Sequence, residues 1–488
     1  MVPMKEREHE AGEGRESDGP AELHPMTIDG LEVAGKASFA VEDPATSRTI
    51  GYAPDCAPED LDAAMDGAAR AFADWREDEN ARRGILSRCA DEIEGHVDSL
   101  ARLLTLEQGK PLARASEEVQ GAAAWFRITA ELPIPVEVVQ DDERARIEVH
   151  RRPLGVVAAI TPWNYPFMLA AWKIAPALLA GNTVVLKPSP FTPLTTLVLG
   201  SLLRSVLPPG VLNTVSGGDE TGAAMSSHPA VRKISFTGSI EAGKHVAAAA
   251  ADDLKRVTLE LGGNDPAIVL DDVDTPEIVE RLFWGAFMNS GQVCSAIKRL
   301  YVPRSRHDDI VESLAERVER ARTGSGLEPD VELGPLNNRS QLERVARLAA
   351  DAERRGGRFV TGGGAIEGPG YYFAPTLVTD VDEEASLVTE EQFGPVLPVL
   401  SYDDVDDAVE RANDTRYGLS GSVWSSDPER AACIATRLEC GTTWVNQHMA
   451  ILPHVPFGGL KWSGIGVENG PWGLLSFTEI QTRHVART

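Results

Sequence analysis

A cysteine in a small polar loop is the first residue that could carry chemistry. Residues 289–295 read NSGQVCS and place Cys294 between two strongly patterned regions. A free thiol has a pKa of about 8.5, so only a few per cent is the nucleophilic thiolate at neutral pH. Gly291, Gln292 and Ser295 permit close backbone approach and supply hydrogen-bond donors. On the loop alone, Cys294 is either an inert sulfur or a nucleophile.

The other cysteines lack such a setting. Cys56, Cys89 and Cys433 lie in segments containing Ala or Leu, and we expect them to fill apolar space. Five cysteines without regular spacing do not make a disulfide framework. This favours a reducing compartment, and we expect a cytoplasmic protein.

Two polar side chains close apolar segments that have the composition of strands. Glu260, in LELGGND, is a general base if it is buried with a raised pKa, or an exposed residue at a strand end. Asn164, in TPWNYPF, follows GVVAAI and is a neutral donor of the kind that stabilises an oxyanion. The alternative for Asn164 is a turn asparagine beside two prolines.

Three further segments suit a nucleotide. Lys187 ends a strand in LKPSPFTP, where a cofactor hydroxyl or phosphate would lie, or it is a solvated lysine. SFTGSIEAGK places Gly238 and Gly243 at a helix start, which suits a pyrophosphate. In EEQFGPVLPV, a turn explains the Gly-Pro pair but not the acidic residues before it, among them Glu391.

Several common catalytic signatures are missing. The sequence has no HExxH, no Cys/His cluster of zinc spacing, no GxSxG, no Walker loop and no GxGxxG after a strand. Metal-dependent, serine-hydrolase and P-loop chemistry are unsupported, and we expect no metal.

The elements around these residues indicate two α/β domains in series. Residues 58–131 show helical spacing of apolar positions, with a Pro at the start. From residue 155 to 263, short segments rich in Val, Ile and Thr alternate with helical ones, which predicts βαβ units and a parallel sheet. A second alternating series runs from residue 265 to 447. Ligands of such sheets bind at the carboxyl ends of the strands.

Composition excludes some partners. The formal net charge of −27 argues against broad nucleic-acid binding. The longest apolar runs are interrupted by Lys173 and Arg204, short of the ~20 residues of a membrane span. Residues 1–25 are polar, without the apolar core of a secretory signal, and we expect a disordered tail.

In their order and spacing these segments resemble one family. PWN, KPS, FTGS, ELGGND, NSGQVC, EEQFGPVLPV, NDTRYGLSGSVWS and PFGGLKWSGIG are similar to the NAD(P)-dependent aldehyde dehydrogenases over roughly residues 44–482. The most specific part is the 34-residue spacing between Glu260 and Cys294. The resemblance implies a Rossmann-like cofactor domain, an α/β catalytic domain and a small β oligomerisation element.

We assign these domains to segments of the chain. Residues 26–133 and 153–259 form the NAD(P)-binding domain, and 260–440 the catalytic domain. A charged hairpin at 134–152 and the tail 471–488 have no place in either core, and exposed strands of this kind pair with other chains. They fit the oligomerisation element, and the resemblance implies a homodimer or homotetramer.

The resemblance also implies a mechanism. Cys294 attacks the aldehyde carbon, Asn164 and the backbone N–H of Cys294 hold the oxyanion, and Glu260 activates the water that hydrolyses a thioester. Lys173 matches a lysine near the catalytic centre whose role we leave open. The cofactor is NAD or NADP. The implied cofactor-binding residues are Ile160, Thr161, Trp163, Lys187, Ser189, Gly238, Ser239, Gly262, Glu391 and Phe393.

Two departures from the family pattern concern specificity. Pro190 stands where many NAD-preferring members carry an acidic residue, and without that charge a 2′-phosphate is not repelled. His448 and His454 lie in the substrate-side stretch NQHMAILPHVPFGG and either touch the substrate or have structural roles. The sequence does not name the aldehyde.

Two alternatives to a hydrolytic enzyme remain. CoA-acylating relatives often lack the glutamate at position 260, so its presence favours release of a free carboxylate. A catalytically silent structural protein on this fold would be expected to lose the nucleophile or the cofactor residues.

Overall fold

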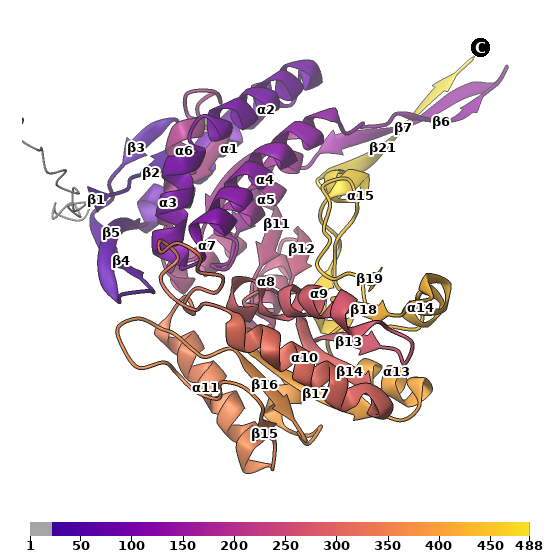
Figure 1. Cartoon of the computed structure of the whole chain (residues 1–488). Helices are drawn as coiled ribbons and strands as arrows, with labels where there is room; N and C mark the ends of the chain where they lie inside the picture. Colours follow the sequence, from indigo (N-terminus) through magenta and orange to yellow (C-terminus); the bar gives the residue numbers. More distant parts are fainter. Residues whose placement is uncertain (1–21, 488) are drawn as a thin grey trace, which may run out of the picture.

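Two large sheets, each with helices packed against it, form the body of the chain in a computed structural model that describes residues 22–487 (Figure 1). The predicted helical region contains α1 (Pro58–Trp75), α2 (Glu79–Glu94), α3 (Val97–Gln108) and α4 (Leu112–Glu131). Residues 82–108 belong to two helices rather than one, because Gly95 caps α2 and His96 leaves helical geometry.

The first sheet has eight strands, in the order β20-β12-β11-β8-β9-β10-β2-β3. Its centre is parallel, as predicted. These strands are β8 (Val156–Ile160), β9 (Thr183–Lys187), β10 (Leu212–Thr214), β11 (Val231–Thr237) and β12 (Arg256–Glu260). The helices among them are α5 (Pro166–Leu179), α6 (Leu194–Leu203), α7 (Asp219–Ser227) and α8 (Ile240–Ala251).

The strand order of this sheet reverses beside β8. The chain passes from β8 to β9 and β10 on one side, then continues with β11 and β12 on the other. In open α/β sheets, a ligand crevice lies outside the carboxyl ends of the strands at such a switch point. The segments after β8 and β11 are therefore the places to look for a site.

The second sheet has seven strands in the order β15-β16-β17-β14-β13-β18-β19. These are β13 (Asp265–Val269), β14 (Ile297–Pro303), β15 (Arg358–Phe359), β16 (Thr376–Thr379), β17 (Val396–Tyr402), β18 (Ser420–Trp424) and β19 (Thr442–Val445). Its helices are α9 (Thr275–Phe287), α10 (His307–Arg320), α11 (Arg339–Arg354), α12 (Ser386–Thr389), α13 (Val405–Asn413) and α14 (Pro428–Ala435). The sheet thus runs past residue 440, the expected end of the second domain.

A three-stranded ribbon projects from the body (Figure 1). The predicted hairpin is β6 (Glu137–Asp141) and β7 (Ala145–Pro153), and the C-terminal strand β21 (Thr478–Ala486) pairs antiparallel with β7 after α15 (Gly470–Leu475). The hairpin and β21 form a sheet of their own, but the prediction that the whole tail 471–488 lies outside both cores is wrong, because Leu474 and Phe477 are buried in the core of the first sheet.

Strands that the sequence analysis did not predict complete the edges. β2 (Met26–Ile28) and β3 (Leu31–Val33) extend one edge of the first sheet, and β20 (Gly464–Ile465) the other. A small sheet contains β1 (Glu22–Leu23), β5 (Arg48–Asp55) and β4 (Ala37–Asp43).

Most of the expected tail, residues 1–21, lies outside the described residues. Its expected end at residue 25 is wrong, because β1 pairs with β5 and the N–H of His24 donates to the carbonyl of Tyr52 at 3.0 Å. Between residues 22 and 487, no helix combines the length and the apolar composition that crossing a membrane requires.

Candidate active site

A cavity of about 650 Å³ opens at the carboxyl ends of β8, β11 and β12 and reaches residues of the second sheet's half of the chain. Its lining brings together eight of the residues singled out from the sequence. They are Trp163, Asn164, Gly238, Ser239, Gly262, Cys294, Glu391 and Phe393. Residues more than 200 positions apart in the chain therefore share one site.

The loop that carries Cys294 is held in an uncommon conformation. Asn289, Ser290 and Gly291 have φ angles of 51°, 56° and 73°, a left-handed run that non-glycine residues rarely adopt. A Cβ on Gly291 would lie 2.2 Å from the carbonyl oxygen of Gly394, so this position has room only for glycine. Strain of this kind persists where the surrounding structure fixes it, and it clusters at functional sites.

Hydrogen bonds from two directions fix the same loop. The side-chain Nε2 of Gln292 donates to the carbonyl of Asn289 at 2.9 Å, and its Oε1 accepts from the backbone N–H of Asn337 at 2.8 Å. Asn164 Nδ2 donates to the carbonyl of Gln292 at 3.0 Å. An amide nitrogen carries two hydrogens, so Asn164 keeps a second N–H for another acceptor.

The thiol of Cys294 is only partly exposed and lies among charges of both signs. Burial raises its pKa to about 12. Lys298 opposes this rise, whereas Glu391, Glu260 and Asp265 add to it. In this state of the protein the sulfur carries its proton at neutral pH.

Glu260, the last residue of β12, is 4% exposed, and its Oε1 has no hydrogen-bond partner among the described residues. Burial and the nearby Glu468 raise its pKa well above the ordinary value, and Lys173 opposes the rise. Lys173 is itself committed elsewhere, because its Nζ donates to Glu468 at 2.6 Å and to Thr237 Oγ1 at 2.7 Å. Glu260 is thus a buried carboxyl group with a high affinity for a proton.

Glu391 and Phe393 form the opposite wall. The backbone N–H of Gly263 donates to Glu391 Oε1 at 3.0 Å, and a Cβ on Gly262 would lie 2.0 Å from Glu391 Oε2. Only glycine at position 262 therefore leaves room for the carboxylate, which lines the cavity. Phe393 has a φ of 51° and its ring meets Trp163 edge-on, with centroids 5.3 Å apart.

The N-terminus of α8 borders the cavity. Ser239 caps the helix, its Oγ accepting from the N–H of Ala242 at 3.2 Å, and Ile240 and Glu241 also line the space. Backbone N–H groups at a helix start favour anions such as phosphates. Together with the adjoining cavity of about 650 Å³, this helix start fits a dinucleotide.

Four expected cofactor residues lie at the same sheet edge but do not line the cavity in the described part of the chain: Ile160, Thr161, Lys187 and Ser189. Lys187 ends β9 and is 4% exposed, and burial lowers its pKa to about 8, with Asp219 and Asp55 opposing the change. The N–H of Thr161 donates to the carbonyl of Lys187 at 3.1 Å.

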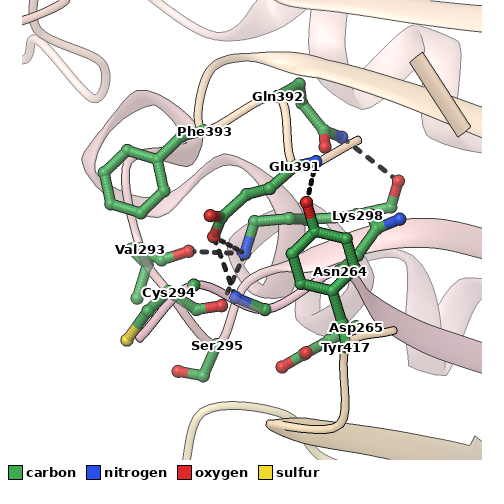
Figure 2. Close-up of polar contacts among 12 residues, drawn as sticks. Asn264, Asp265, Val293, Cys294, Ser295, Lys298, Glu391, Gln392, Phe393 and Tyr417 are labelled. Carbon is green, nitrogen blue, oxygen red and sulfur yellow. Dashed lines mark hydrogen bonds and ion pairs between the residues drawn. The ribbon is translucent and has the colours of Figure 1, made fainter. Parts of the chain in front are cut away.

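Two site residues were missed by the sequence analysis. Glu468 pairs with Lys173, and Lys298 contacts both Glu391 and the Cys294 loop (Figure 2). A signal for Lys298 existed, since it interrupts the apolar strand 297–303, and lysine is almost never fully buried without a partner. Nothing near Glu468 in the sequence connects it to Lys173, 295 residues away.

Two sequence-based interpretations are settled by burial and hydrogen bonding. Cys433, expected to fill apolar space, is exposed, because α14 turns this position to solvent. The ring of His448 has a structural role: Nε2–H donates to the carbonyl of Ser295 at 2.8 Å, and Nδ1 accepts from Ser422 Oγ at 2.9 Å. Burial lowers the pKa of His448 to about 3, so the ring is neutral.

Known proteins resemble this chain along almost its whole length. The family model described as "Aldehyde dehydrogenase family" matches residues 32–483. Phenylacetaldehyde dehydrogenase of Pseudomonas fluorescens is 41% identical over 494 aligned positions, covering 96% of this chain and 97% of that relative.

Solved structures resemble it equally well. The NAD+ complex of an aldehyde dehydrogenase from Bacillus cereus has a TM-score of 0.94 and 35% identity, covering 96% of this chain and 97% of that one. An NADP-dependent enzyme from E. coli has a TM-score of 0.93 and 37% identity, covering 95% of this chain and 98% of that one.

Proposed function

Since the chain belongs to the aldehyde dehydrogenase family, an NAD(P)-dependent group of enzymes, we propose that it oxidises its aldehyde through a thioester on Cys294 that water hydrolyses. The observation that carries this proposal is the meeting of Cys294 and Asn164 in one cavity, with the buried carboxyl group of Glu260 close enough to raise the pKa of the thiol.

The first step uses the thiol and the amide. The thiol of Cys294 loses its proton to solvent, its sulfur forms a bond to the aldehyde carbon, and the electron pair of the broken C=O π bond moves to the oxygen, which becomes an oxyanion. The second N–H of Asn164 and the backbone N–H of Cys294 are placed to stabilise that oxygen. A single donor of this kind contributes about 3 kcal/mol in other enzymes.

NAD or NADP would be held by the walls already described. Glu391 would accept a hydrogen bond from the nicotinamide ribose, Phe393 and Trp163 would confine the ring, and Ser239 with the start of α8 would hold the pyrophosphate. Gly238 permits the backbone to approach. Ile160, Thr161, Lys187 and Ser189 would meet the adenosine half at the ends of β8 and β9. When bound, the nicotinamide accepts a hydride from the substrate, and the loss of this hydride oxidises the substrate.

Glu260 then completes the cycle. Its carboxylate takes a proton from water, the resulting hydroxide attacks the thioester carbon, and the carbon–sulfur bond breaks to release a carboxylic acid and restore Cys294. A raised pKa makes Glu260 a stronger base than an ordinary glutamate. The glutamate at this position favours water over CoA as the acceptor, and the retained nucleophile argues against a silent structural protein.

The surroundings of Cys294 favour an apolar aldehyde. The sulfur packs against a cluster formed by Leu169, Trp172, Leu419, Trp444 and Phe457. Apolar and aromatic walls favour binding of an uncharged substrate, because they offer no partner to the charge of an ionic one. The name of the Pseudomonas fluorescens relative, phenylacetaldehyde dehydrogenase, agrees with an arylalkyl substrate.

The remaining proposals concern cofactor preference and assembly. Pro190 places no carboxylate where a 2′-phosphate would lie, so we expect NADP to be accepted as well as NAD. We further propose domain boundaries at residues 133, 153 and 260, with the second domain extending past residue 440 to include β19. The ribbon would form the contact of a homodimer or homotetramer, and five free thiols support a cytoplasmic location.

Replacing the nucleophile tests this function. Cys294→Ala is expected to lower NAD(P)H formation from phenylacetaldehyde by about 10³-fold or more while still binding NADH, because only the covalent step is lost. Cys440→Ala is the matched control, a half-buried thiol outside the cavity whose pKa burial also raises to about 12. Turnover by Cys294→Ala close to that of the control would contradict the proposal.

A further inference from the structure

Lys298 makes a three-way contact at the centre of the site (Figure 2). Its Nζ donates to the carbonyl oxygens of Val293 at 2.8 Å and Cys294 at 2.6 Å, and lies 3.3 Å from Glu391 Oε1. An ammonium group has three hydrogens, so these three acceptors satisfy it completely. The side chain is 1% exposed, so the ammonium depends on these partners rather than on water.

The partners of Lys298 belong to two different parts of the proposed machinery. The two carbonyls are those of the nucleophile and of the residue before it. Glu391 Oε1 is held between Lys298 and the N–H of Gly263, which fixes the carboxylate in the wall of the cavity with Oε2 against Gly262. One side chain therefore connects the Cys294 loop to the carboxylate that faces the cofactor space.

We propose that Lys298 is a positioning residue that holds the Glu391 carboxylate toward the cofactor ribose, fixes the Cys294 loop, and provides the positive charge that makes the Cys294 thiolate accessible. This inference rests on the proposed function of Cys294 and Glu391. It adds a residue that binds neither substrate nor cofactor but acts on both through its contacts.

The charges that face Cys294 explain why one cation matters. Glu391, Glu260 and Asp265 are acidic, and each raises the pKa of the thiol. Asp265 also shares a hydrogen bond with Ser420. Among the largest influences on the pKa of the thiol, Lys298 is the one that lowers it.

The other titratable neighbours leave this balance unchanged. His448, behind the loop at Ser295, has its pKa lowered and stays neutral. Tyr165, on the side of α5, has its pKa raised by burial and is neutral at physiological pH. Removing Lys298 would therefore take away the strongest cationic influence on the thiol and leave that of the carboxyl groups.

Alkylation of Cys294 by iodoacetamide measures the effect on the thiol without substrate or cofactor. At pH 8, which is below the thiol pKa, raising that pKa by one unit lowers the thiolate fraction tenfold. The thiolate also becomes more nucleophilic, so alkylation slows only about three- to fourfold for each unit. For Lys298→Met we expect alkylation of the Cys294 peptide, followed by mass spectrometry, to slow by about threefold or more. Lys298→Arg should stay near the wild-type rate, because it keeps the charge.

Binding of NADH measures the positional effect. Both Lys298→Met and Lys298→Arg should weaken it about tenfold, since a planar guanidinium does not reproduce the three contacts that orient Glu391. Lys255→Met is the matched control: Lys255 is also buried, donates to the carbonyl of Ser226, and lies before the start of β12, the opposite end from Glu260. It should change neither the alkylation rate nor NADH binding.

Wild-type alkylation and NADH binding in a folded Lys298→Met protein would overturn the inference. If that variant does not fold, Glu391→Gln decides, because removing the carboxylate should speed alkylation, and an unchanged or slower rate would contradict the charge balance. A failure of the proposed function gives a different result. If Cys294 is not the nucleophile, wild-type enzyme that is fully alkylated at Cys294 would still form NAD(P)H. This result does not depend on the rate at which any variant is alkylated.

Discussion

Glu260 and Lys173 lie near each other at the end of the first sheet but differ in how their charges are satisfied. Lys173 is 0% exposed and has two hydrogen bonds, whereas Glu260 Oε1 has none among the described residues. Burying a carboxyl oxygen without a hydrogen-bond partner lowers the stability of the fold, so such a group is typically retained for a function. This contrast supports Glu260, rather than Lys173, as the group that exchanges a proton during the reaction.

Substituting Glu260 separates the two half-reactions. Glu260→Gln keeps the size of the side chain but not the base, so we expect a first turnover of NAD(P)H followed by a steady state about 10²- to 10⁴-fold slower. Rapid-mixing kinetics and mass spectrometry of an acyl adduct on Cys294 measure this. A steady-state rate equal to that of the wild type would remove Glu260 from the hydrolytic step.

The pH dependence follows from the same residue. Hydrolysis needs the carboxylate, and the pKa of Glu260 is raised, so the base is lost as pH falls through that raised value. The acid limb of kcat should therefore lie well above pH 4.5, the ordinary value for glutamate. This limb should disappear in Glu260→Gln, and its persistence there would assign it to another group.

At this scale the sequence predicted some residues and not others, for physical reasons. Cys294 and Glu260 could be singled out because loop and strand composition already indicate polar groups in unusual settings. Lys298 could not be given a role, because only the fold brings Glu391, from a distant segment, to the ammonium that also binds the nearby Cys294 loop. Cys433 was misplaced because neighbouring alanines do not determine which side of a helix faces the core.

Among the elements, the Cys294 loop and the turn at Gly394 depend on each other. The left-handed run ends at Gly291, which lies directly against the carbonyl of Gly394, next to Phe393. Gln341 Nε2 donates to the carbonyl of Phe393 at 2.8 Å and holds that turn from α11. The nucleophile and the aromatic wall of the cofactor space are thus packed back to back.

Adding one methyl group tests this packing. Gly291→Ala should lower turnover by about tenfold or more and destabilise the fold by about 1–3 kcal/mol, because both the φ of 73° and the 2.2 Å approach to Gly394 oppose a Cβ. Gly356→Ala is the matched control, with a φ of 95° but no atom within 4 Å of the added carbon. Gly356→Ala should lower the stability measured by thermal unfolding but leave the turnover measured by steady-state kinetics unchanged. Equal turnover in both variants would contradict the packing argument.

Element types were easier to predict than their partners. The parallel strands of both sheets follow from runs of Val and Ile, and the helices from their spacing. β20 was not predictable, because two residues, Gly464–Ile465, pair with β12 some 200 positions earlier. β1 was missed because its backbone pairing with β5 requires no distinctive side chains.

For the whole molecule, the projecting ribbon raises the question of what covers it. Ile480 is 63% exposed and Val485 48% exposed on β21, and Val138 and Val139 are 49% and 66% exposed on or beside the paired part of β6. Apolar side chains on an isolated three-stranded ribbon gain stability only if another surface buries them. A second copy of the chain is the occupant that the family resemblance implies.

A charge on the ribbon should therefore weaken self-association. In a two-fold interface each residue appears twice, and burying one isoleucine contributes about 1.5–3 kcal/mol, so Ile480→Asp should raise the dissociation constant by about 100-fold or more. Leu31→Asp is the matched control, because Leu31 is 67% exposed on β3 at the edge of the first sheet, outside the ribbon. Light scattering across a dilution series should show smaller particles for Ile480→Asp alone, with unchanged thermal unfolding at high concentration. If both variants keep the wild-type mass, or if Leu31→Asp alone dissociates, then the ribbon is not the contact that joins the subunits.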